Sequence, residues 1–89
     1  MYYVYVLISL KDGKFYIGFT EDVVQRVKEH NAGKNVSTKN RCPLKLIYYE
    51  FHTSKLDALK RERYFKTTKG KTTLKQVLKN SLTTSYTQT

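Results

Sequence analysis

The sequence predicts a single small α/β domain of the α+β type, in which a three-stranded antiparallel sheet is flanked by helices in the order ββαβαα. Two runs rich in β-branched and aromatic residues are joined by Asp12-Gly13, which favours a hairpin because both residues tolerate positive φ. Helix-capping residues follow this hairpin and a later apolar run. With 89 residues, we expect one domain over residues 1–80 and a flexible polar tail over 81–89.

The first half of the chain predicts a hairpin and a helix. Residues 3–8 and 14–19 form the expected strands. Thr20 is a suitable N-cap for a helix over residues 21–31, because the acidic residues that follow it would lie at the positive end of the helix dipole. Gly33 is a suitable residue just beyond the end of this helix.

The second half of the chain predicts a strand and two helices. A polar, basic surface loop leads to the third strand, over residues 44–51. Ser54 begins a sequence that resembles a capping box, which predicts a helix over residues 55–66. A third, basic helix is expected over residues 71–80, after Gly70.

Charge and cysteine content restrict the classes of function. Seventeen Lys and Arg against seven Asp and Glu give a net charge of +10, so nucleic acid is the first partner to consider, anionic membrane the second, and a merely soluble basic domain the alternative. One cysteine, Cys42, excludes an intramolecular disulfide and a four-cysteine zinc site. The N-terminus has neither a basic region nor a long apolar run. We therefore expect no signal peptide, no membrane span and a cytoplasmic location.

One carboxylate is out of place on the helix expected over residues 55–66. At 100° per residue, Glu62 lies between Ala58 and Leu59 on the apolar face. Burying a carboxylate without a partner is costly, so Glu62 should either pair with a basic side chain or bind a cation. The pattern alone leaves both alternatives open.

A set of polar residues on adjacent elements indicates phosphodiester chemistry. Arg26 and His30 lie one helical turn apart on one face, and Tyr5 and Tyr16 lie on the two hairpin strands. Each of these residues has an ordinary explanation: Arg26 and His30 as solvated polar side chains, and the tyrosines as strand residues whose hydroxyl groups contact solvent. Together with Glu62, however, they supply charge neutralisation, proton transfer and a metal ligand, which phosphodiester hydrolysis requires.

The order and spacing of these residues resemble the GIY-YIG nuclease family over about residues 1–70. The first motif lacks the family's glycine and keeps its tyrosine. Gly18, in the second motif, would let another group approach the backbone closely. The matching segments are Tyr3-Val4-Tyr5, Tyr16-Ile17-Gly18, Arg26 followed by His30-Asn31 and Gly33, and the sequence DALKRE ending in Glu62.

The resemblance implies a role for each matching residue. Glu62 would hold one divalent cation, Mg²⁺ or Mn²⁺, with water and phosphate oxygens as the other ligands. Arg26 would clamp the scissile phosphate. Either Tyr5 or Tyr16 would take the proton of the attacking water, and His30 would assist this transfer or orient a tyrosine. Because tyrosine has a reference pKa of about 10, a tyrosine base needs nearby cations, which Arg26 and the metal would supply.

The resemblance also implies a function: a metal-dependent endonuclease acting on DNA, with low sequence specificity, in repair or recombination. No small-molecule cofactor and no membrane are expected, and a protein partner would supply specificity. Two alternatives are a non-catalytic nucleic-acid-binding module and an interaction subunit of a larger complex. The basic residues expected to contact phosphates are Lys34, Lys39, Arg41, Lys45, Lys66, Lys69 and Lys71.

Overall fold

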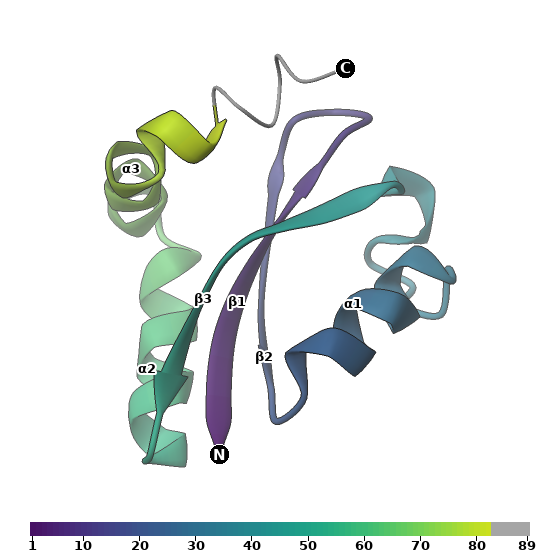
Figure 1. Cartoon of the computed structure of the whole chain (residues 1–89). Coiled ribbons are helices and arrows are strands. Elements are labelled where there is room, and N and C mark those ends of the chain that lie inside the picture. The colour runs from purple at the N-terminus through teal and green to yellow at the C-terminus, as the bar shows by residue number, and fades with distance from the viewer. Residues whose placement is uncertain (83–89) are drawn as a thin grey trace.

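The computed structural model describes residues 1–82 and has helices on both faces of a three-stranded antiparallel sheet (Figure 1). The predicted order ββαβαα is confirmed, with a short 3₁₀ helix added in the basic loop. No helix in the described part of the chain is long and apolar enough to cross a membrane. The elements are β1 (Tyr2–Ser9), β2 (Phe15–Thr20), α1 (Val23–Asn31), the 3₁₀ helix η1 (Lys39–Arg41), β3 (Leu44–His52), α2 (Lys55–Phe65) and α3 (Thr68–Val77).

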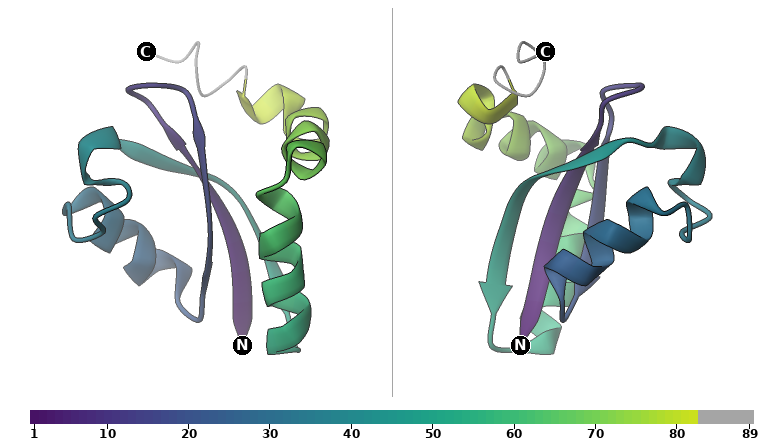
Figure 2. Two further views of the ribbon diagram at one scale, coloured as in Figure 1. Left: turned by 180° about the vertical axis from the view of Figure 1, so that it is seen from behind. Right: turned by 45° about the vertical axis from the view of Figure 1, so that its right-hand side comes forward.

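Strand β1 is the centre of the sheet, whose order is β2-β1-β3. Its side chains alternate between two buried clusters. Val4 and Val6 pack with Phe65 in the cluster beneath α2 and α3, whereas Tyr5 packs with Val23 in the cluster beneath α1. Figure 2 shows the sheet between α1 on one side and α2 with α3 on the other. The central strand is apolar along almost its whole length because both of its faces are buried.

Helix α1 begins at Val23, later than predicted, because Asp22 caps it instead of Thr20. The Asp22 carboxylate accepts a hydrogen bond from the Gln25 backbone N–H at 3.0 Å. Thr20 still belongs to β2, and its hydroxyl accepts from the Asp22 backbone N–H at 3.1 Å. Gly33 has a φ of 75°, as expected for the residue just beyond a helix end.

Helix α3 also differs from the prediction, since it spans Thr68–Val77 and not residues 71–80. The Thr67 hydroxyl caps it by accepting from the Gly70 backbone N–H at 3.0 Å. Gly70 therefore lies inside the first turn rather than before the helix. A Cβ at this position would lie 2.8 Å from the Cα of Phe65, so Gly70 allows α3 to pack closely against the end of α2.

Leu82, near the start of the predicted tail, packs against the folded domain. The backbone N–H of Leu82 donates to the Leu78 carbonyl at 2.8 Å, and the Leu82 side chain packs against the cluster beneath α2 and α3. Leu82 thus belongs to the folded domain because it adds apolar area to this cluster. Residues 83–89 of the predicted tail lie outside the described residues.

A carboxylate on β3 holds helix α2 against the sheet. Glu50 accepts hydrogen bonds from the Tyr48 hydroxyl at 2.8 Å, from His52 Nε2 at 2.7 Å and from Arg61 Nε at 2.9 Å. Burial acts to raise the pKa of Glu50, but these hydrogen bonds outweigh it and lower the pKa below 4.5. The guanidinium carbon of Arg61 also lies 4.4 Å from the centre of the Phe65 ring.

Candidate active site

Two hairpin tyrosines lie on the face of the sheet that α1 covers. The strand register places Gly18 directly opposite Tyr5 and Tyr16 opposite Leu7, so the two tyrosines are diagonal neighbours whose ring centres are 6.3 Å apart. The Tyr5 ring lies over Gly18, because a Cβ there would be 2.7 Å from Tyr5 Cε1 and even closer to its hydroxyl. The group that approaches the Gly18 backbone is thus the Tyr5 ring itself.

Gly18→Ala should destabilise the fold and displace the Tyr5 ring. The added methyl group overlaps a buried ring, and overpacking of this kind costs about 1–3 kcal/mol. We expect the midpoint of denaturant unfolding to fall with an unchanged slope. Thr20→Ala, on the same strand, is a control for general effects on β2, and an unfolding midpoint for Gly18→Ala above that of the parent would contradict the close approach.

A buried line of hydrogen bonds runs from Tyr5 through His30 to Thr38. The Tyr5 hydroxyl lies 2.9 Å from His30 Nε2, and His30 Nδ1 lies 2.7 Å from the Thr38 hydroxyl. His30 and Thr38 are fully buried. A neutral ring satisfies both bonds when Nδ1 carries the proton and donates to Thr38, while Nε2 accepts from Tyr5. No sequence pattern marks Thr38, which lies in the basic loop.

The surroundings shift the pKa of the two titratable members of this line, Tyr5 and His30. Burial raises the pKa of Tyr5 to about 12, although the Arg26 guanidinium acts to lower it. The expected help from a cation is present, but burial outweighs it. Burial and the Arg26 charge together lower the pKa of His30 below 6.5. His30 is therefore neutral at pH 7 and able to accept a proton.

The His30 pKa predicts that the protein loses stability on mild acidification. Because the pKa of the folded state lies below the unfolded value of about 6.5, the contribution of neutral His30 is fully present above pH 6.5 and is lost as the pH falls through the folded value. Glu50 and Asp12 remain ionised there, since their pKa values lie below 4.5 and 3.8. We expect the melting temperature to drop between pH 7 and pH 5.5, and His30→Gln to reduce this drop. An equal drop in both proteins would contradict the assignment.

Arg26 lies on α1 beside this line and carries unused hydrogen-bonding capacity. Its Nη1 is 3.4 Å from the Glu29 carboxylate. Its Nε is buried and has no hydrogen-bond partner within residues 1–82. The side chain is 41% exposed, so its outer nitrogens can reach an anion in solution. Below, Tyr5, Tyr16, Arg26 and His30 are called the tyrosine cluster.

Glu62 belongs to helix α2, which lies across the sheet from α1 (Figure 2). Its side chain is 18% exposed and accepts from Lys66 Nζ at 3.2 Å, so the salt bridge considered from the sequence is present. The negative charge of Glu62 is also near enough to Tyr5 to act, weakly, to raise that pKa. Glu62 thus forms an ion pair with a surface lysine and also has a small electrostatic effect on the pKa of Tyr5.

The donor set fits a hard cation that brings most of its own ligands. Residues 1–82 contain no group of three or more His, Cys, Asp or Glu side chains that could hold a metal. Mg²⁺ in phosphoryl-transfer sites is bound through one or two carboxylates, with waters and substrate phosphates completing the shell. The single carboxylate of Glu62 matches this mode and does not match a zinc site.

The other residues singled out from the sequence take different positions. Asn31 ties the end of α1 to β3, since its amide donates to the Leu44 carbonyl at 2.9 Å and its oxygen accepts from the Leu44 N–H at 2.8 Å. Arg41 clamps the hairpin by donating to Asp12 at 3.3 Å and to the Phe15 carbonyl at 3.1 Å. The exposed members of the predicted phosphate-contacting set are Lys34, Lys39, Lys45, Lys66, Lys69 and Lys71.

Known proteins resemble this chain in sequence and in structure. Residues 1–76 match the GIY-YIG catalytic domain. A UPF0213 protein of Lacticaseibacillus paracasei is 50% identical over 66 residues, which cover 73% of each chain. A UPF0213 protein of Staphylococcus epidermidis is 42% identical over 77 residues, 85% of this chain and 93% of the relative. The solution NMR structure of a UPF0213 protein of Bacillus halodurans, 34% identical, covers 100% of both chains with a TM-score of 0.58.

Proposed function

The chain belongs to the GIY-YIG family, and we propose that it is a metal-dependent endonuclease that hydrolyses phosphodiester bonds in DNA. Membership implies a nuclease-related fold and nucleic-acid binding in general. One observation carries the finer proposal: the buried Tyr5 hydroxyl has a proton acceptor, His30 Nε2, at 2.9 Å, next to Tyr16 and Arg26. In an active nuclease this pair can accept the proton of an attacking water.

In the proposed mechanism, the tyrosine cluster orients the attacking water and removes its proton. Tyr16 is the more exposed of the two tyrosines and binds the water. The water's proton passes to the Tyr5 oxygen as the Tyr5 hydroxyl proton moves to His30 Nε2, so no free tyrosinate has to form at a pKa of about 12. The water oxygen bonds to phosphorus, the bond to the departing sugar oxygen breaks, and that oxygen takes a proton from solvent.

Two charged residues stabilise the phosphate during this reaction. Arg26 donates from its exposed nitrogens to the phosphate oxygens as negative charge builds up on them. Glu62 would hold one Mg²⁺ or Mn²⁺ after exchanging its ion pair with Lys66. When bound, this cation supplies Lewis-acid stabilisation of the phosphate charge. Arg26 and the cation both act on the phosphate and do not contact a nucleobase, so we propose low intrinsic sequence specificity.

The biological setting proposed here follows from that chemistry. An endonuclease that binds DNA through its phosphates, without regard to sequence, suits DNA repair or recombination in the cytoplasm, where a protein partner would select the site. The exposed lysines of the predicted set would grip the backbone, with an affinity that falls as the salt concentration rises.

The proposal is tested by nicking of supercoiled plasmid with the purified protein and Mg²⁺ or Mn²⁺. We expect conversion to open circles that stops when EDTA is added. Branched and nicked oligonucleotide duplexes, assayed in parallel, extend the test to structured substrates. Salt-sensitive binding without cleavage of any of these DNAs would overturn the proposed activity and favour the non-catalytic binding module.

A further inference from the structure

A second concave site lies between the β1–β2 hairpin and helix α3, on the face of the sheet opposite the tyrosine cluster. It has a volume of about 630 Å³ and is open to solvent on one side. A cavity of this size is within the usual range for a small-molecule or nucleotide site. We call it the lysine pocket, and its walls are formed by Gly13, Lys14, Phe15, Arg41, Lys71, Lys75 and Leu82.

The charge in the lysine pocket is not neutralised by nearby carboxylates. Arg41 is paired with Asp12, but within residues 1–82 no ion pair joins Lys14, Lys71 or Lys75 to an acidic side chain. Lys71 and Lys75 lie one helical turn apart on α3, a spacing at which like charges destabilise a helix. The fold therefore keeps three mutually repelling ammonium groups around one cavity, which an anion would relieve.

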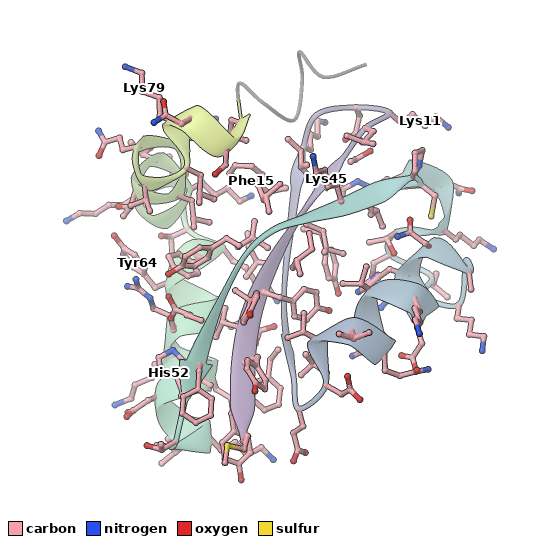
Figure 3. The ribbon with its side chains drawn as sticks, viewed as in Figure 1. Lys11, Phe15, Lys45, His52, Tyr64 and Lys79 are labelled. Carbon is pink, nitrogen blue, oxygen red and sulfur yellow. The ribbon has the colours of Figure 1, made fainter. Side chains whose placement is uncertain are left out.

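An aromatic ring lines the same pocket. Phe15 is half-buried and points from β2 toward α3 (Figure 3). Nucleic-acid bases stack on exposed aromatic rings regardless of sequence, and nearby lysines bind the attached phosphates. The combination of one ring and three unpaired lysines matches a nucleotide better than a free inorganic anion, which would leave the ring unused.

The lysine pocket is connected to the tyrosine cluster through an edge strand. Phe15 and Tyr16 are consecutive residues of β2 and therefore point to opposite faces of the sheet, as their packing in the two different core clusters shows. Strand β2 is at the edge of the sheet, so a flexible polynucleotide can pass around that edge from one face to the other. A rigid duplex cannot bend so sharply over a single strand.

We propose that the lysine pocket binds an unpaired nucleotide that adjoins the bond to be cleaved, with its phosphate on Lys71 and Lys75 and its base against Phe15. This inference rests on the proposed function and specifies its substrate class: DNA with a single-stranded segment at a branch or an end. The pocket adds affinity for that segment and places the neighbouring phosphate at the tyrosine cluster.

Binding is measured by fluorescence anisotropy in EDTA, so that the result does not depend on cleavage. The probes are a labelled blunt duplex and the same duplex with an oligothymidine tail on the 5′ or the 3′ strand. We expect at least one tailed probe to bind about fivefold or more tighter than the blunt duplex. The double variant Lys71→Ala/Lys75→Ala should abolish this preference and reduce the salt dependence by roughly one to two released ions.

Two further variants separate the pocket from general charge effects. Lys55→Ala/Lys60→Ala removes the same charge from exposed positions on α2. Helix α2 begins at the end of the molecule far from the hairpin turn (Figure 1). This control should weaken all probes alike and keep the preference for a tail. Phe15→Leu, which preserves an apolar side chain, should reduce the preference without changing the salt dependence.

The outcomes distinguish this inference from the proposed function. Equal affinity for tailed and blunt probes, or a preference for a tail that survives Lys71→Ala/Lys75→Ala, would overturn the nucleotide pocket even if plasmid is cleaved. Loss of the preference in both double variants would show that it reflects overall charge and would overturn the pocket too. A preference lost only in the pocket variants would support it even if no cleavage is seen.

Discussion

Arg26→Lys is expected to lower the rate of DNA cleavage by at least about 100-fold, the usual effect of removing one donor from a charge-stabilising site. The substitution keeps the positive charge but loses the planar set of donors that matches phosphate oxygens. The Tyr5 hydroxyl is the largest influence on Arg26 and acts to raise its pKa, so the guanidinium is placed beside the tyrosine cluster as well as beside Glu29. We therefore expect the maximal rate to fall and affinity for DNA to change little.

Single-turnover cleavage with saturating protein measures this rate separately from binding. Arg63→Lys is the matched control, because Arg63 is an exposed residue of α2 and its replacement should leave the rate unchanged. Circular dichroism checks that Arg26→Lys is folded. Cleavage by Arg26→Lys at the parent rate would remove Arg26 from the reaction and leave it as a surface residue of α1.

Glu62→Gln is expected to abolish metal-dependent cleavage, with a fall of about 1000-fold, equivalent to roughly 4 kcal/mol of transition-state stabilisation. The amide keeps the shape of the side chain but cannot bind Mg²⁺ strongly. Binding of DNA in EDTA should be unchanged or slightly tighter, because a negative charge beside the phosphate is removed. This opposite behaviour of binding and cleavage is expected of a catalytic carboxylate, and the dependence on Mn²⁺ identifies it as a metal ligand.

Cleavage as a function of Mn²⁺ concentration, together with calorimetric titration of Mn²⁺ into the protein–DNA complex, tests the Glu62 prediction. Glu21→Gln makes the same chemical change at an exposed position before α1 and should behave like the parent. Undiminished cleavage by Glu62→Gln, at any Mn²⁺ concentration, would mean that Glu62 serves only its ion pair with Lys66.

The fold was predictable where local sequence determines it. The hairpin at Asp12-Gly13 and the cap at Ser54 depend on neighbouring residues alone, and the structure confirms both. The predicted start of α1 was wrong because Asp22 caps this helix instead of Thr20. The predicted start of α3 was wrong because Thr67 caps it and Gly70 lies inside its first turn. The spacing of residues along the sequence does not determine which of several nearby residues caps a helix.

The sequence predicted which residues form the candidate site, but not how they contact one another. Sequence motifs suggested Tyr5, His30 and Glu62, but not which tyrosine hydroxyl lies beside His30 or that Thr38 completes the line. Thr38 comes from an irregular loop, where no periodicity marks a buried hydroxyl. The raised pKa of Tyr5 was also unpredictable, because it depends on how deeply the ring is buried. The lysine pocket likewise requires the tertiary placement of α3 beside the hairpin.

The hydrogen bonds of Glu50 restrict the rotation of helix α2 about its own axis. Arg61 and Glu62 are consecutive, so they project about 100° apart around the helix. By binding Arg61 to Glu50 at 2.9 Å, strand β3 resists rolling of the helix and thereby sets the direction of the neighbouring carboxylate. A substitution at the β3 edge can thus reorient Glu62 from a distance, without touching either tyrosine or the bound DNA.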